Sequence, residues 1–232
     1  MPDRALLICD LDETLIDGNS FRLLVIELAR PRAWWSLGPT TPLRLGGLVA
    51  RRAARRLDRV AFKRRTHALV RDLPAGRRAR LADRMALVLG RRLRPDVSAA
   101  VTTARELGCT TYLATAAFEE HARPLATACG FDHVVATTWP TDRGEWVELR
   151  AEVKRDAVVR AAAEMGAGPP WILLSDHEDD EPLADLCEQV FWVARRTPLR
   201  PGLTNEVAFT LASFSSHLRT LGAGGDGPAP VG

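Results

Sequence analysis

Residues 5–15, ALLICDLDETL, decide the fold of this chain. The first five are apolar and stop at Asp10, which is the pattern of a short strand buried on both faces of a parallel sheet. The same pattern recurs in four later segments, residues 110–114, 131–138, 171–174 and 190–193. These five segments are therefore predicted to form the strands of one sheet.

Helical periodicity separates the predicted strands. Apolar residues recur at spacings of three and four in residues 96–107, 118–129 and 151–165. Strands that alternate with helices predict an α/β fold, a doubly wound, Rossmann-like parallel sheet. Ligands of such sheets bind beyond the carboxyl ends of the strands. The polar residues that follow the apolar runs, Asp10, Asp12, Thr115, Asp176, Asp179 and Asp180, are therefore expected to share one site.

The composition is that of a globular protein with a sizeable core. The chain has 232 residues, of which 46% are hydrophobic and 26% charged, which excludes collagen-like, disulfide-stapled and wholly disordered proteins. The sequence contains no uninterrupted apolar stretch of about 18 residues, so no membrane-spanning helix is predicted. The first residues do not resemble a secretory signal. The four cysteines form no CxxC pair, which argues against structural zinc and favours a reducing, cytoplasmic location.

The formal charge of +3 hides a division of the chain into two parts. Residues 21–94 hold 20 basic and four acidic residues, for a net charge of +16, and the rest carries −13. This basic segment lacks strand-like runs and has helical periodicity, so we expect a helical cap at 21–94, inserted into a core formed by 1–20 and 95–221. Residues 222–232, rich in glycine and proline, are predicted to be a disordered tail.

Asp10 and Asp12 place two carboxylates at the end of the first strand. Two such groups repel each other unless a cation or a shared proton compensates them, and Mg²⁺ prefers oxygen ligands. A bare DxD pattern is also compatible with an acidic turn or a helix cap.

The segment DLDETL at residues 10–15 resembles the first motif of haloacid dehalogenase-type phosphatases. Three further motifs follow in the family's order: Thr115 after an apolar strand, Lys154 at the start of a helix, and SDHEDDEPL at 175–183 after another strand. The resemblance covers residues 6–193. Four ordered motifs in matching contexts are much more specific than any one of them.

The resemblance implies a role for each matching residue. Asp10 would attack phosphorus and form an aspartyl-phosphate, and Asp12 would serve as general acid and then as general base. Thr115 and Lys154 would bind the phosphoryl oxygens, Thr115 helped by backbone N–H groups near Phe118. Mg²⁺ would be held by the Asp10 carboxylate, the main-chain carbonyl of Asp12, and Asp176. Dehalogenases of the family lack an acid at the position of Asp12, so its presence favours phosphate chemistry.

Other residues of these segments are less specific. By itself, Thr115 could be a helix cap or a strand residue, and Lys154 a surface lysine. Lysine is nevertheless rare here, with 30 arginines against two lysines. The second lysine, Lys63, is followed by Arg64 and Arg65 and is expected to be a solvated charge. Asp180 matches the second acid of the fourth motif and would support the metal, while the roles of Asp179 and His177 stay open.

The substrate is less well specified. A helical cap resembles the branch that contains phosphoserine phosphatases. That group carries a Glu nine positions after its nucleophile and a Ser-Gly-Gly second motif, whereas this chain has Asn19 and Thr115-Ala-Ala. The fourth motif and its flank, FWVARRTPLR, also resemble C-type phosphatidylglycerophosphate phosphatases. The sequence therefore predicts a Mg²⁺-dependent phosphomonoester hydrolase for an anionic small molecule or a phospholipid monophosphate.

The arginine-rich part of the cap leaves alternatives open. Leu45, Leu48, Val49, Ala53, Leu57, Val60 and Ala61 are predicted to share one helical face, opposite a row of arginines. This face either packs inside the cap or, with Trp34 and Trp35, meets an anionic membrane at its inner surface. Nucleic acid is not favoured as a partner, since stacking aromatics and a recognition motif are lacking. The alternative to an enzyme is a noncatalytic scaffold of the same fold, or a module that binds a membrane surface or a partner protein.

Overall fold

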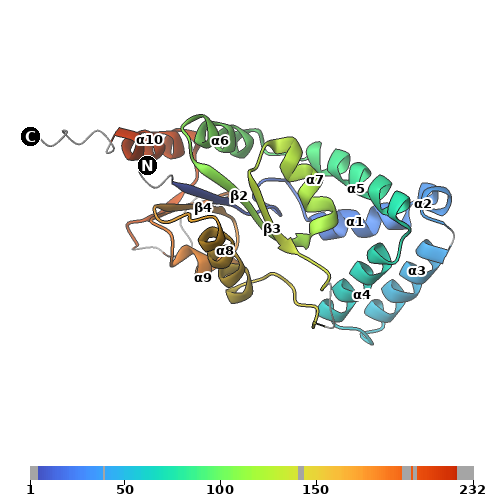
Figure 1. Cartoon of the computed structure of the whole chain (residues 1–232). Helices are drawn as coiled ribbons and strands as arrows, with labels where there is room; N and C mark the ends of the chain where they lie inside the picture. The colour runs from blue at the N-terminus through green and yellow to red at the C-terminus, as the bar shows by residue number, and fades with distance from the viewer. Residues whose placement is uncertain (1–4, 39, 141–143, 195–199, 201–202, 224–232) are drawn as a thin grey trace, which may run out of the picture.

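A single parallel sheet organises the protein, as seen in the computed structural model (Figure 1). The structure describes residues 5–38, 40–140, 144–194, 200 and 203–223, and of Arg32, Trp34, Trp35, Gly222 and Ala223 only the backbone. Over these residues the sheet has six strands in the order β3-β2-β1-β4-β5-β6. The strands are β1 (Leu6–Cys9), β2 (Thr110–Phe118), β3 (His133–Thr137), β4 (Trp171–Ser175), β5 (Gln189–Trp192) and β6 (Glu206–Ala208).

Strand β1 lies in the middle of the sheet and is buried on both faces, as its apolar sequence predicted. It pairs in parallel with β2 on one side and β4 on the other, with Cys9 opposite Leu113 and Leu174. The two faces of the sheet form separate apolar clusters: Leu7 belongs to one cluster and Ile8 to the other. The predicted α/β doubly wound, Rossmann-like fold is confirmed.

Helices cover both faces of the sheet. On one face lie α6 (Pro95–Glu106), α7 (Glu119–Cys129) and α10 (Leu211–Ala223), and on the other α8 (Glu152–Glu164) and the short α9 (Glu181–Ala184), which follows the 3-10 helix η1 (Glu178–Asp180) (Figure 1). Gly130 ends α7 in the left-handed region at φ 78°, where glycine carries no Cβ penalty. Helix α10 includes residues 222 and 223, so the part of the expected tail that is described is helical; residues 224–232 lie outside the described residues.

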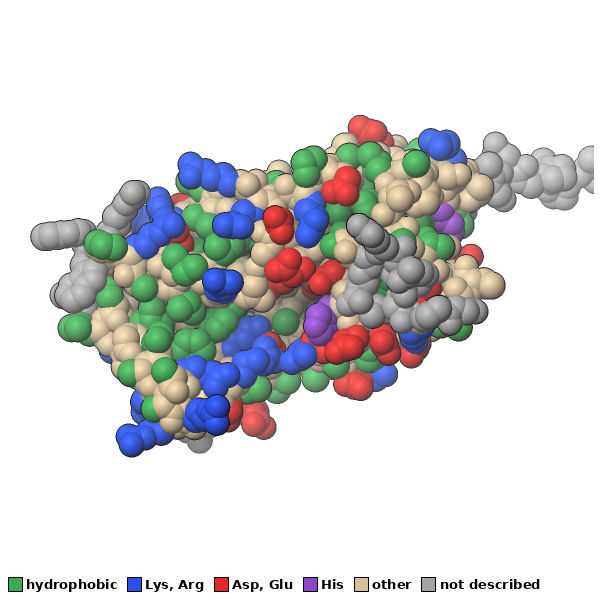
Figure 2. All heavy atoms as spheres, turned by 180° about the vertical axis from the view of Figure 1, so that it is seen from behind, with side chains coloured by type: hydrophobic (Ala, Val, Ile, Leu, Met, Phe, Trp, Pro, Cys, Tyr) green, Lys and Arg blue, Asp and Glu red, His purple; other side chains and the backbone are tan. Residues whose placement is uncertain are grey.

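Five helices lie between β1 and α6 in the sequence, and the described part of this segment contains no strand. They are α1 (Ser20–Ala29), α2 (Pro31–Ser36), α3 (Thr40–Ala53), α4 (Arg59–Arg71) and α5 (Ala75–Gly90). They gather at one end of the sheet, where α5 packs against α7 (Figure 1). This arrangement is consistent with the expected helical cap, whose bounds at 21 and 94 stay a prediction. Most of the Lys and Arg side chains visible in Figure 2 lie over this half of the molecule.

The apolar face predicted for residues 45–61 is not continuous, and this part of the interpretation is wrong. Helix α3 ends at Ala53, Arg55 takes a positive φ of 55°, and Asp58 starts a new helix by accepting a hydrogen bond from the backbone N–H of Ala61. Because the chain changes direction there, only part of the face is buried. Leu45 and Leu57 are buried, whereas Val49 and Val60 are exposed.

Candidate active site

The carboxyl ends of β2, β1 and β4 bring the predicted site residues together. Asp10 follows β1, Asp176 follows β4, and the backbone N–H of Asp10 donates to the carbonyl of Leu174 over 3.0 Å. Thr115 lies on β2, and Lys154 reaches the same place from the first turn of α8. These residues line one pocket of about 300 Å³, together with Asp12, Asp179 and Asp180. The sequence prediction that they share a site is in accord with this geometry.

Lys154 is the buried cation of the pocket. Its side chain is 96% buried, and its Nζ lies 2.7 Å from Asp10 Oδ1 and 2.8 Å from Asp180 Oδ1. Burial by itself would lower the pKa of Lys154, but the two carboxylates raise it above the ordinary lysine value. Lys154 is therefore a fixed positive charge that holds Asp10 in place.

Asp10 is a buried carboxylate whose negative charge is only partly compensated by Lys154. Burial raises its pKa well above the ordinary value, Lys154 opposes this shift, and the charge of Asp180 adds to it. Asp180 is itself nearly fully buried, and it accepts hydrogen bonds from Lys154 Nζ and from the Ser175 hydroxyl at 2.6 Å. Asp180 therefore binds Lys154 directly. The sequence predicted that Asp180 supports a bound metal, and it would do so indirectly, by fixing the position of Lys154.

Asp12 is oriented by the start of helix α1. The backbone N–H of Ser20 donates to Asp12 Oδ1 at 2.7 Å, and Asn19 Nδ2 donates to Oδ2 at 3.3 Å. Asn19 is also the N-cap of α1, since its Oδ1 accepts from the backbone N–H of Arg22. Burial raises the pKa of Asp12, and the hydrogen bonds from Ser20 oppose the shift. A carboxyl group in such surroundings is suited to holding and releasing a proton.

Thr115 lies in the pocket, but the backbone around it differs from the expectation. Strand β2 does not end at Thr115; it continues to Phe118, and α7 begins at Glu119. The backbone N–H of Ala117 donates to Thr115 Oγ1 at 3.0 Å, so this N–H is engaged within the last residues of β2. The helix start expected near Phe118 therefore lies one residue later, because the apolar run through Phe118 extends the buried strand.

The fourth motif lies around Asp176. Thr14 Oγ1 donates to Asp176 Oδ1 at 2.9 Å, which links the first and fourth motifs, and burial raises the pKa of Asp176. Asp179, whose role the sequence left open, forms a two-pronged ion pair with Arg150. His177 borders the pocket and accepts the backbone N–H of Asp179 through Nδ1.

The sequence interpretation of Lys63 is wrong. Lys63 was expected to be a solvated charge, yet it is 5% exposed and lines the pocket from helix α4. Its Nζ donates to the carbonyl of Ala116 at 2.8 Å and to Glu148 Oε1 at 2.6 Å. Arg59, one turn earlier on α4, also binds Glu148, at 2.9 Å. The rarity of lysine was the only sequence signal for this residue, and nothing pointed to Glu148, which is 85 positions away.

The oxygen donors at the strand ends fit a divalent cation. Within the described residues no cluster of three or more Asp, Glu, His or Cys side chains is arranged for metal binding. The set implied by the sequence needs only two such side chains, Asp10 and Asp176, because its third ligand is the main-chain carbonyl of Asp12. Both carboxyl groups have pKa values raised by burial, and a bound cation would favour their ionised forms. Their hard oxygen atoms suit Mg²⁺.

The chain matches one known protein family. The family model of haloacid dehalogenase-like hydrolases matches residues 7–185. The chain belongs to this family of hydrolases, whose phosphatases generally use Mg²⁺. No curated protein matches the chain significantly. No helix among the described residues is long and apolar enough to cross a membrane.

Solved structures share the fold at low sequence identity. A protein of unknown function from Bordetella pertussis Tohama I is 21% identical with a TM-score of 0.68, over 86% of this chain and 92% of that one. A probable phosphoserine phosphatase from Vibrio cholerae is 14% identical with a TM-score of 0.63, over 97% of this chain and 67% of that one. A HAD family hydrolase from Salmonella enterica serovar Typhi is 14% identical with a TM-score of 0.59, over 84% of this chain and 64% of that one.

Proposed function

We propose that the protein is a Mg²⁺-dependent phosphomonoester hydrolase that works through an aspartyl-phosphate on Asp10. The observation that carries this proposal is the contact of Lys154 with Asp10 and Asp180 at the end of β1. It gives a carboxylate nucleophile a fixed position beside a buried positive charge, in the same pocket as Asp12, Thr115 and Asp176.

The first half-reaction forms the phosphoenzyme. A carboxylate oxygen of Asp10 attacks phosphorus, and the bond from phosphorus to the ester oxygen breaks. Asp12, held by Ser20 and Asn19, transfers its proton to the departing oxygen, so that the leaving group departs as an alcohol. Lys154 and the Thr115 hydroxyl bind the phosphoryl oxygens as negative charge develops on them.

The second half-reaction releases phosphate. Asp12, now ionised, takes a proton from water while the water oxygen attacks phosphorus, and the bond to Asp10 breaks. Mg²⁺, held by Asp10, Asp176 and the carbonyl of Asp12, would neutralise phosphoryl charge in both steps. Thr14 fixes the orientation of Asp176, and Asp180 with Ser175 fixes Lys154.

Two observations bear on which class of phosphate ester is the substrate. The pocket suits the phosphate of a small anionic ester. Helix α3 presents Leu43, which is 63% exposed, next to the exposed Arg44, and Arg51 and Arg52 are exposed near the end of the same helix. That combination favours peripheral contact with anionic lipid, and with it a phospholipid monophosphate as the second candidate substrate. In either case we propose that the enzyme acts in the cytoplasm or at the inner surface of the membrane.

Phosphate release tests the proposal. The purified protein is assayed with p-nitrophenyl phosphate, small phosphomonoesters and phosphatidylglycerophosphate in mixed micelles, with Mg²⁺ and with EDTA. Release is expected only with Mg²⁺, and the Asp10→Asn variant should be inactive while remaining folded. Wild-type activity in Asp10→Asn would refute the mechanism. A folded wild type that binds Mg²⁺ yet releases phosphate from none of these esters would favour the noncatalytic scaffold.

A further inference from the structure

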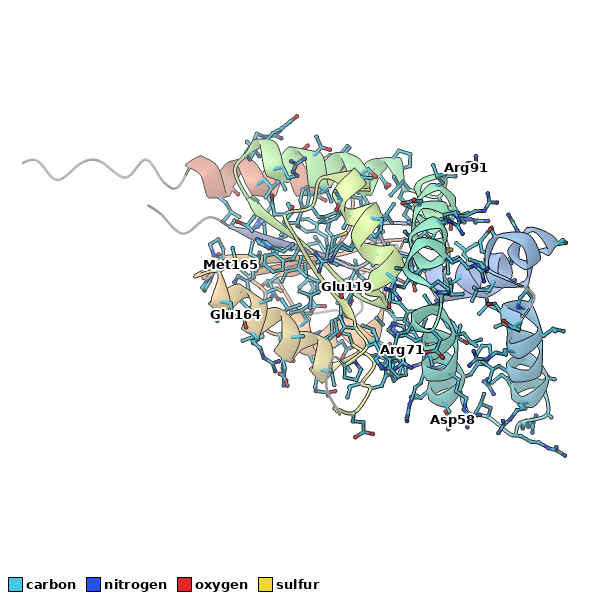
Figure 3. All side chains as sticks on the ribbon, turned by 45° about the vertical axis from the view of Figure 1, so that its right-hand side comes forward. Asp58, Arg71, Arg91, Glu119, Glu164 and Met165 are labelled. Atoms are coloured by element: carbon cyan, nitrogen blue, oxygen red, sulfur yellow. The ribbon has the colours of Figure 1, made fainter. Side chains whose placement is uncertain are left out.

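The wall of the pocket contributed by the cap has its own polar chemistry, separate from the groups that handle phosphate. Lys63 on α4 and Glu148 in the segment before α8 form a buried ion pair, with side chains only 7% and 8% exposed. Figure 3 shows α4 with Asp58 and Arg71 marking its ends. Lys63 lies near enough to Asp12 for their charges to interact, which places it beside the group that protonates the departing oxygen.

Each member of this pair keeps one hydrogen-bonding position for a ligand. The ammonium group of Lys63 has three N–H donors, and the described residues provide acceptors for two of them, Ala116 O and Glu148 Oε1. The carboxylate of Glu148 has about four acceptor positions. Three are used, one by Lys63 and two by Arg59. The pair thus presents a donor and an acceptor side by side.

We propose that Lys63 and Glu148 recognise a hydroxyl group of the leaving group, so that the preferred substrates are phosphate esters of polyols. This inference rests on the proposed phosphatase function. A hydroxyl oxygen can accept from Lys63 and donate to Glu148 at the same time. A carboxylate could accept from Lys63 but has no proton to donate to Glu148, and an ammonium group could donate to Glu148 but cannot accept from Lys63.

Two other polar groups of the pocket already have partners. Asn19 is engaged on both sides, by Asp12 and by the backbone of Arg22. Arg150 and Asp179 likewise satisfy each other. The pocket of about 300 Å³ admits a phosphate with a small organic group. A longer organic group would extend out of the pocket beside Arg59, whose side chain is 50% exposed.

The first test compares two esters that differ only in hydroxyl groups, glycerol 3-phosphate and propyl phosphate. The wild type is expected to prefer glycerol 3-phosphate by about 10- to 100-fold in kcat/KM, because buried polar groups are left unpaired by the propyl ester. Lys63→Met should reduce this ratio at least about tenfold. Arg64→Met, a change at the exposed neighbouring position, is the matched control and should keep the wild-type ratio.

The second test uses a variant with the opposite effect. Glu148→Gln removes the negative charge that repels a carboxylate, so activity on 3-phosphoglycerate should rise about tenfold relative to glycerol 3-phosphate. Lys63→Met should lower the same relative activity. Circular dichroism and thermal unfolding establish that each variant is folded, and the isosteric Glu148→Gln carries the test alone if Lys63→Met is not folded.

Binding separates the failure of this inference from the failure of the proposed function. Calorimetric titration of the Asp10→Asn protein with the two esters measures the preference without turnover. An equal affinity for glycerol 3-phosphate and propyl phosphate, or an unchanged ratio in folded Lys63→Met, would overturn the role of the pair. A wild type that shows the binding preference but releases no phosphate would keep the recognition and refute the hydrolase.

Discussion

Removal of the buried cation Lys154 tests the electrostatic reasoning on the site most directly. In Lys154→Met the oxygens of Asp10 and Asp180 that flank Nζ at 2.7 and 2.8 Å lose their common partner. Two oxygens that close to one nitrogen lie at most about 5.5 Å apart, where unit charges repel by about 3 kcal/mol at an effective dielectric constant of 20. With the attraction to lysine also lost, we expect a fall of about 3–5 kcal/mol in the free energy of unfolding at pH 8.

The loss should depend on pH with a defined sign. Without Lys154 the pKa of Asp10, already raised by burial, rises further, and a carboxyl group whose folded-state pKa is raised loses stability as the pH rises above its unfolded value. In the wild type the pKa of Asp10 is already raised to about 8, so below that pH both folded proteins keep Asp10 protonated and lose stability in parallel. The gap between wild type and variant should therefore widen as the pH rises above about 8, where only the variant keeps Asp10 protonated. A single proton limits the slope to about 1.4 kcal/mol per pH unit.

Urea unfolding with EDTA present, followed by circular dichroism at several pH values, measures this gap. Arg155→Met is the matched control, because Arg155 is the next residue of α8 and, among the described residues, forms its ion pair with the exposed Asp156. It should change the free energy of unfolding by less than about 1 kcal/mol. A loss below about 1 kcal/mol in Lys154→Met, with no dependence on pH, would refute the view that Lys154 compensates the two carboxylates.

Three further outcomes are expected. Thr14→Val removes the hydrogen bond to Asp176 and should raise the Mg²⁺ concentration for half-maximal activity by about tenfold or more. A Mg²⁺ titration of phosphate release measures this concentration, and an unchanged value would mean that Thr14 does not orient Asp176. Gly130→Ala forces an alanine to φ 78° and should lower the free energy of unfolding by about 1–2 kcal/mol in urea, whereas no loss would contradict the argument from backbone strain. Glu206→Gln weakens the bond from Trp192 Nε1 at 2.9 Å and should cost about 1–3 kcal/mol, with a fluorescence change of Trp192 as the second readout.

The strands were predictable where the local sequence is distinctive. The apolar runs that end at Asp10 and Ser175 correspond to β1 and β4, because a strand buried on both faces must be apolar throughout. The edge strand β6 was not predicted. It has three residues, Glu206–Ala208, and its only large apolar side chain is a valine, so it carries no local signal. The burial of Glu206 in this strand depends on Trp192, 14 positions earlier, and on Arg200, and these partners meet it only in the folded protein.

The amphipathic face of the cap shows how local periodicity can mislead. Residues 45–61 have apolar side chains at helical spacing, yet the turn before Asp58 divides them between α3 and α4. Periodicity reports which side chains could share a face of one helix, but it does not report where the chain turns. The capping residue Asp58 was the available sequence signal for that turn.

The sequence by itself determined the places of β1 to β5 along the chain, the positions of Asp10, Asp12 and Asp176 just after β1 and β4, the position of Lys154 at the start of a helix, and the charge of the cap. Each of these follows from neighbouring residues, since strand burial and helix starts are set within a few positions. The tertiary structure alone decided that Lys63 is buried and paired with Glu148. These two residues are 85 positions apart, so their ion pair forms only when the cap helix packs against the core loop. The same packing removes Lys63 from water, which lowers its pKa and places it in the wall of the pocket.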